Sequence, residues 1–197
     1  MKAVVIPILL CSALILPACE DRSAEEAEQR AAAAARDAEL AQARAERMAA
    51  MEIDRLAALW NYHDMPVDQG RQRTAAIRSA NSVDTDGTGP RSVQLVFRDH
   101  ASWGRSSYLV LQVGDFACAP RCTVDVTADD AAPARMAARR PDTDDAIAIF
   151  INDAQALWRL TSGATRISIE FPVRASGTRT ASFDVAGLDA SKMPGWE

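Results

Sequence analysis

A change in hydrophobic periodicity divides this chain and limits what it can fold into. Residues 20–60 consist almost entirely of good helix formers, and they contain no glycine or proline. From about Ala75 onward, apolar and polar residues alternate with a period of two, which is the pattern of half-buried strands. The sequence therefore predicts a helix followed by a β-rich domain.

The segment before the predicted helix has the plan of a bacterial secretory signal. Lys2 precedes a short apolar run that ends in Leu16-Pro17-Ala18-Cys19. This tetrapeptide resembles the lipobox of bacterial lipoproteins, although Pro17 departs from the usual pattern. The resemblance implies a signal peptide over residues 1–18 and a lipid on Cys19. The alternative is a secreted protein cleaved near Ala18, whereas a run of about thirteen apolar residues is too short for a transmembrane helix.

Residues 19–60 are predicted to form an alanine-rich helical stalk or linker. Alanine fills most of its apolar face, whereas a sustained coiled coil needs larger residues along its seam. The side chains at 49, 53, 56 and 60 share one face near the end, so we expect the last turns to pack on the domain. Association with a partner helix through the alanine face is the alternative.

Residues 61–197 are predicted to form the β-rich domain. Alternation predicts seven strands, at 75–83, 92–98, 106–113, 122–126, 146–151, 167–171 and 181–185. Asn152 is placed to cap one short helix that stops at a left-handed Gly163. Residues 61–73 and 128–145 are expected to be a connector and a long polar loop. The predicted fold class is α+β, with a sandwich-like or barrel-like domain.

Two cysteines, Cys118 and Cys122, remain once Cys11 and Cys19 are assigned to the leader and the lipid. In an oxidising compartment such an even pair predicts a disulfide. A zinc site would need two further ligands, for which His63 and His100 are the only histidines. Neither a metal nor a cofactor is predicted.

Composition and motifs argue against two classes of function. The chain carries 27 acidic and 22 basic residues, a net charge of −5, which does not suit nucleic-acid binding. It contains no Gly-x-Ser-x-Gly elbow, phosphate-binding glycine loop or His-Glu-x-x-His motif, so we do not expect an enzyme. Arginine makes up 20 of the 22 basic residues, which indicates either recognition of carboxylates and phosphates or a compositional bias.

Three residues are candidates for partner binding: Trp103 and Arg105 on one predicted hairpin, and Arg179 on another. Tryptophan and arginine dominate binding hot spots. Two interpretations of Trp103 stay open, because it can fold back over the end of the sheet or anchor a partner.

From Trp60 onward, the chain resembles a group of poorly characterised proteobacterial envelope lipoproteins. The matching segments are Trp60-Asn61-Tyr62, residues 76–83, Phe116-Ala117-Cys118 with Cys122-Thr123-Val124, and Phe183 followed by Gly187-Leu188. This resemblance implies an envelope location and brings no function with it. In addition, Ser176-Gly177-Thr178-Arg179 is similar to the turn by which membrane-bound lysozyme inhibitors enter the enzyme's cleft, with Thr180 in place of the expected tyrosine.

These observations lead to the hypothesis of a lipid-anchored, periplasm-facing lipoprotein that binds an envelope protein or a cell-wall partner. The outer membrane is favoured over the inner membrane for the anchor on Cys19. One alternative is an inhibitor or immunity protein against a lysozyme-type cell-wall hydrolase. The other is an accessory subunit of a secretion machine.

Overall fold

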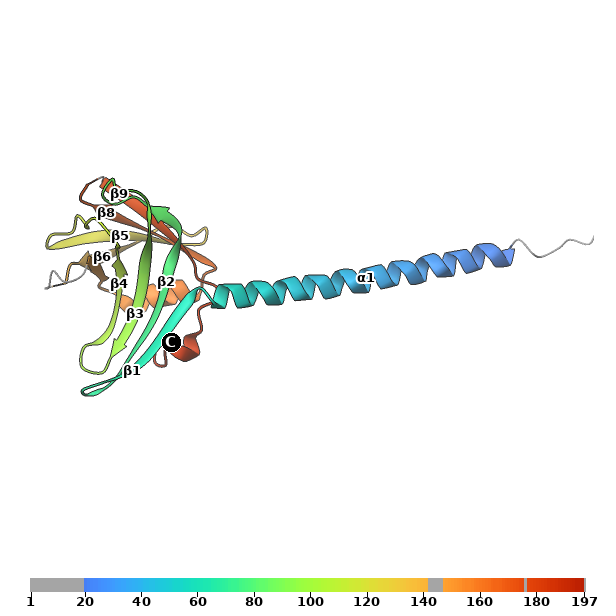
Figure 1. The fold of residues 1–197 in the computed structure, drawn as a ribbon, viewed down its shortest axis with the longest axis horizontal. Helices are drawn as coiled ribbons and strands as arrows, with labels where there is room; N and C mark the ends of the chain where they lie inside the picture. Colours follow the sequence, from blue (N-terminus) through green and yellow to red (C-terminus); the bar gives the residue numbers. More distant parts are fainter. Residues whose placement is uncertain (1–19, 142–146, 176, 197) are drawn as a thin grey trace, which may run out of the picture. The chain divides into compact units, whose positions relative to one another are not determined.

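The computed structural model describes residues 20–141, 147–175 and 177–196 (Figure 1). Cys19 and the predicted signal peptide lie outside the described residues. The chain divides into two compact units, and the boundary falls between Ala49 and Ala50 within the long helix. All the sheet strands belong to the second unit.

Helix α1 (Glu20–Ala57) confirms the predicted helix. Side chains from Arg22 to Arg55 are exposed, and neighbouring turns are linked by ion pairs such as Arg30 to Glu26 at 3.1 Å. Of the side chains expected to pack on the domain, Ile53 is 66% exposed, whereas Leu56 is half-buried and Trp60 is buried. Leu56 can approach the domain because Gly187 lacks a side chain that would collide with its backbone. Within the described residues, no helix combines the length and apolar character needed to cross a bilayer.

Nine strands in the described residues form one antiparallel sheet, which is open and not a closed barrel. Their order across the sheet is β1-β2-β3-β4-β7-β6-β5-β8-β9. The bounds are β1 Trp60–Val67, β2 Gly70–Val83, β3 Arg91–His100, β4 Gly104–Val110, β5 Arg121–Ala128, β6 Ala134–Arg139, β7 Ala148–Ile151, β8 Arg166–Val173 and β9 Gly177–Asp184. The prediction of about seven strands was therefore too low, and the domain is a single curled sheet.

The two strands that the prediction missed have weak alternation. β1 is an edge strand with mostly exposed side chains, and it contains Pro66. Its sequence therefore led to the prediction of a connector. β6 points only Met136 and the small Ala138 into the core. Neither segment carries the run of large apolar residues that signals a half-buried strand.

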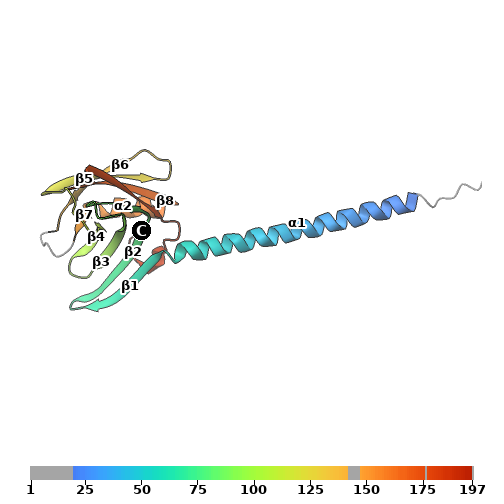
Figure 2. The ribbon, with the colours of Figure 1, turned by 45° about the horizontal axis from the view of Figure 1, so that its top comes forward.

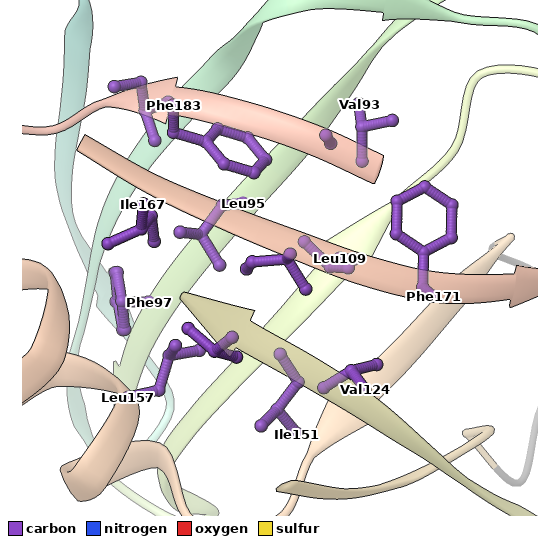
Figure 3. Packing of buried hydrophobic residues seen from close by; sticks show 14 of the residues in the cluster. Val93, Leu95, Phe97, Leu109, Val124, Ile151, Leu157, Ile167, Phe171 and Phe183 are labelled. Atoms are coloured by element: carbon purple, nitrogen blue, oxygen red, sulfur yellow. The ribbon is translucent and has the colours of Figure 1, made fainter. Parts of the chain in front are cut away.

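Helix α2 (Ala154–Ser162) lies inside the curl of the sheet (Figure 2). Its N-cap is Asp153, one residue later than expected, and the Asp153 carboxylate accepts a hydrogen bond from the amide of Ala156 at 2.8 Å. Gly163 ends the helix with a φ of −97°, so the predicted left-handed stop is wrong. Leu157 packs among the inward side chains of several strands (Figure 3).

The C-terminal segment completes the cover of the inner face. Met193 and Trp196 are buried, and the Trp196 carbonyl accepts a hydrogen bond from the Gln155 side chain at 2.7 Å. The amide of Asp189 donates to the hydroxyl of Tyr62 on β1, also at 2.7 Å. The segment therefore spans from α2 to the edge strand.

Cys118 and Cys122 are joined as a disulfide, with their Cα atoms 4.9 Å apart. Cys118 is buried against the core, and Cys122 lies in β5. The bridge therefore fixes the loop that leads into this strand. The short loop it closes corresponds to about 2 kcal/mol in the chain-entropy model.

The unpaired side of β9 is met by a side chain of β2. The β2–β3 register shifts between Arg78 and Ser82, which frees Asn81 from the ladder. The Asn81 amide donates to the carbonyl of Thr180 at 2.9 Å and accepts from the amide of Ser182 at 2.8 Å. One asparagine thus joins the two ends of the curl without a backbone ladder.

We predict that Asn81→Ala lowers the free energy of unfolding by about 1–2 kcal/mol, because two hydrogen bonds at net values near 1 kcal/mol are lost. Urea denaturation of the full chain measures this change. Asn61→Ala on the exposed face of β1 is the matched control and should change stability by less than about 0.5 kcal/mol. Equal stability of the two variants would contradict the bridging role of Asn81.

Candidate functional site

The outer face of the sheet carries a group of cationic and aromatic side chains on four neighbouring strands. We call it the arginine–aromatic patch; it consists of Arg98, Trp103, Tyr108, Arg139 and Phe150. Strand alternation turns the four strand side chains outward, because Phe97, Leu109, Ala138 and Ile149 point into the core, and Trp103 belongs to the turn between β3 and β4. The register then places Tyr108 opposite Phe150, and Phe150 opposite Arg139.

The guanidinium of Arg98 lies at the centre of the patch. Its central carbon is 5.3 Å from the ring centroid of Trp103, 5.5 Å from that of Tyr108 and 5.9 Å from that of Phe150. Arg139 lies 5.2 Å from the Phe150 centroid, and the Tyr108 and Phe150 rings are 5.1 Å apart. All these distances are within the range of cation–π and aromatic contacts.

Trp103 folds back over the end of the sheet and is nevertheless exposed. Its position is therefore compatible with both predictions for this residue, packing on the sheet and contact with a partner. Its ring stacks on the ring of His100 with centroids 3.9 Å apart, yet 70% of the residue is exposed. His100 is buried, and its Nδ1 accepts a hydrogen bond from the amide of Ser102 at 3.1 Å. The indole is therefore held in place before any partner arrives, which lowers the entropy cost of binding.

The positive charge of the patch is not neutralised within the part of the chain that the structure describes. Arg98 donates to the hydroxyl of Ser106 at 3.2 Å, and there neither Arg98 nor Arg139 has a carboxylate within ion-pair distance. Arg121 stands directly opposite Arg139 in the β5–β6 register. In contrast, Arg135 on the same strand pairs with Asp125 at 2.8 Å.

Burial raises the pKa of Tyr108, and the nearby charge of Arg98 offsets part of this increase. The phenol is therefore neutral at physiological pH, with a hydroxyl that can donate or accept a hydrogen bond. The patch thus offers two cations, three rings and one hydroxyl.

Arg105 lies beside the patch in a pocket that shares Arg139 and Phe150 with it. The pocket has a volume of about 300 Å³ and is lined by Arg105, Ser106, Arg139, Phe150, Ile151, Asn152 and Ala154. The Arg105 guanidinium donates to the side-chain oxygen of Gln155 at 3.3 Å and lies 5.9 Å from the ring centroid of Trp196. Trp103 and Arg105 therefore occupy one end of the sheet but face different surroundings.

Arg179 belongs to another part of the domain. Its Nε donates to the carbonyl of Asp84 at 2.8 Å, just after β2 and near the Arg91 end of β3. Trp103 follows the His100 end of β3, and ten strand residues span roughly 30 Å. The structure does not bring Arg179 together with Trp103 and Arg105.

A larger groove, about 730 Å³ in volume, lies between the last turns of α1 and β8 and β9. Two ion pairs lie in it: Arg166 pairs with Asp184 at 2.9 Å, and Arg55 pairs with Glu52 at 2.7 Å. Hydrogen bonds from Thr165 and Arg166 lower the pKa of Asp129. Asp129 and Asp130 also line the groove, so its charge is negative, opposite in sign to the charge of the patch.

Comparison with protein-family models, curated proteins and solved structures found no match to this chain. The function is therefore inferred from the residues themselves. The patch combines exposure, fixed geometry and unbalanced charge, which makes it the strongest candidate for a binding surface.

We predict that Arg98→Gln raises the pKa of Tyr108 further, because removing a nearby positive charge disfavours the phenolate. Tyrosinate absorbance during an alkaline titration measures this pKa, with Tyr62→Phe as the background so that one tyrosine titrates. Arg135→Gln on β6 is the matched control and should leave the titration unchanged. An identical Tyr108 pKa with and without Arg98 would contradict their contact.

Proposed function

We propose that this protein is a lipid-anchored binding module of the bacterial cell envelope, and that the arginine–aromatic patch binds an acidic protein partner. The observation that carries the proposal is the guanidinium of Arg98 set among three rings with no carboxylate partner in the described residues. A cation without a carboxylate partner attracts a protein surface of opposite charge.

The residue types of the patch support a protein partner over a small molecule. Tryptophan, tyrosine and arginine are the residues most enriched at binding hot spots. The patch extends over four strands and one hairpin tip, so it suits a broad contact better than an enclosed ligand.

The proposed location rests on the sequence. The lipobox-like tetrapeptide ending at Cys19 would anchor the chain, with the outer membrane favoured over the inner. The 38 residues of α1 would then supply a spacer of about 57 Å at 1.5 Å per residue.

The alternatives stay predictions without a supporting contact. An inhibitor that used Arg179 would need its guanidinium to enter an enzyme's cleft, but this group donates to the carbonyls of Asp84 and Thr178. Ser176 of the same motif lies outside the described residues. No specific feature of the structure favours an accessory subunit of a secretion machine.

We predict that a photo-crosslinking amino acid at position 103 or 108 captures a discrete protein in the living host. The same amino acid at Glu170, exposed on the outer face of β8, is the matched control and should capture none. In a chain carrying Arg98→Gln, crosslinking from position 108 should fall about tenfold, because a cation that meets an acidic partner is lost.

Two outcomes would contradict the proposed function. One is equal capture from position 170 and position 103. The other is capture that Arg98→Gln leaves unchanged while thermal unfolding shows the variant to be folded.

A further inference from the structure

The pocket beside the patch receives one arginine from each of two strands. Arg105 comes from β4 and Arg139 from β6, with Phe150 and Ile151 of β7 between these strands. Both arginines are exposed, and the described residues give neither an ion pair. Two positive charges thus line one cavity, and no carboxylate is among the described residues that line it.

Neighbouring contacts leave these guanidiniums available for an anion. Arg139 donates no side-chain hydrogen bond within the described residues, and its contact with Phe150 uses the ring face. Among the described residues, the Arg105 side chain donates to the neutral amide of Gln155 alone, at the long distance of 3.3 Å. The nearby Asp153 carboxylate is engaged by the amide of its own helix, at Ala156.

The remaining lining residues indicate what else the anion carries. Phe150, Ile151 and Ala154 form an apolar wall, which suits a hydrocarbon arm better than a bare phosphate. Ser106 and Asn152 add a hydroxyl and an amide that can bond to a peptide backbone. Guanidinium groups match the planar carboxylate with paired hydrogen bonds.

We infer that this pocket is a carboxylate subsite that takes a glutamate side chain from the acidic partner. The inference rests on the proposed function, because it names the chemistry that the partner presents beside the patch. The carboxylate lies between Arg105 and Arg139, and the methylene groups of the glutamate contact Phe150 and Ile151. The volume of about 300 Å³ accommodates one such side chain with part of its backbone.

The test is a nuclear magnetic resonance titration of the ¹⁵N-labelled full chain. The probe is N-acetyl-glutamate N-methylamide, and its uncharged match is N-acetyl-glutamine N-methylamide. The glutamate probe should give saturable shifts at positions 105, 139, 150 and 152, and the glutamine probe should bind about tenfold more weakly because a charged hydrogen-bond acceptor is lost.

Titrations of three variants test whether the glutamate probe binds at this pocket. Arg105→Gln and Arg139→Gln should each weaken the glutamate probe about tenfold, whereas the control Arg135→Gln should not. The unchanged amide spectrum away from the pocket shows that a variant is folded. Equal affinities of the two probes, or equal loss in all three variants, would overturn the subsite.

Two further arms separate the sources of the anion. Inorganic phosphate that binds as tightly as the glutamate probe would overturn the carboxylate assignment. A soluble cell-wall stem peptide that binds more tightly than a capped Ala-Glu-Ala peptide would overturn a protein partner in favour of the cell wall.

Failure of the proposed function is distinguishable from failure of the subsite. Arg98 lies outside the pocket, so Arg98→Gln should lower partner capture from position 108 about tenfold and leave the affinity for the glutamate probe unchanged. Probe binding without any crosslinked protein would overturn the partner surface alone. Crosslinking without probe binding would overturn the subsite alone.

Discussion

The fold depends on how the inner face of one open sheet is covered, since the described strands all belong to that sheet. α2 supplies Leu157 and Trp158, and the C-terminal segment supplies Trp196. Phe97 of β3 joins these elements, because its ring meets Trp158 edge-on at 5.0 Å and Trp196 at 5.5 Å. Loss of one such ring from a close-packed core costs about 3–5 kcal/mol. The side chains of the inner face therefore form the core that stabilises the fold.

The outer face follows from the same packing. Each large residue that points inward fixes its neighbour outward, as Phe97 does for Arg98 and Ile149 does for Phe150. The side chains of the patch are thus mounted on strands that the core holds in register, and Trp103 is further braced by His100. A surface fixed in this way loses little conformational freedom when a partner binds.

The sequence allowed the helix, seven of the strands and the cysteine pair to be predicted, because each has a local signal. β1 and β6 lacked the large alternating residues of that signal. Strand order has no local signal at all, and here β4 pairs with β7 after more than thirty intervening residues. The contact of Tyr108 with Phe150 therefore could not be derived. The sequence pattern indicates only that each of these two residues lies in a strand.

The candidate residues show the same limit. Trp103 and Arg105 were chosen because a tryptophan on a hairpin tip is unusual, and their binding role stays a prediction. Arg179 was grouped with them from residue type and from the resemblance of its turn to that of lysozyme inhibitors, whereas the curl of the sheet takes β9 to the loop after β2. Arg98 and Arg139 could not be distinguished among the 20 arginines of the sequence, since only the register reveals which described residue each of them faces across the sheet.

Arginine-rich composition explains the number of arginines on this domain but not their pairing. Asp64 pairs with Arg71 and Arg73, Asp125 with Arg135, Asp184 with Arg166, and Asp115 with Arg140 and Arg174. At the patch the pattern reverses, because Arg139 faces Arg121 and Arg98 faces Ser106. Like charges opposite one another on paired strands are destabilising. Other arginines of the described domain, such as Arg78, Arg91 and Arg159, also have no ion pair there, so the patch is distinguished by the aromatic rings against which its two arginines lie.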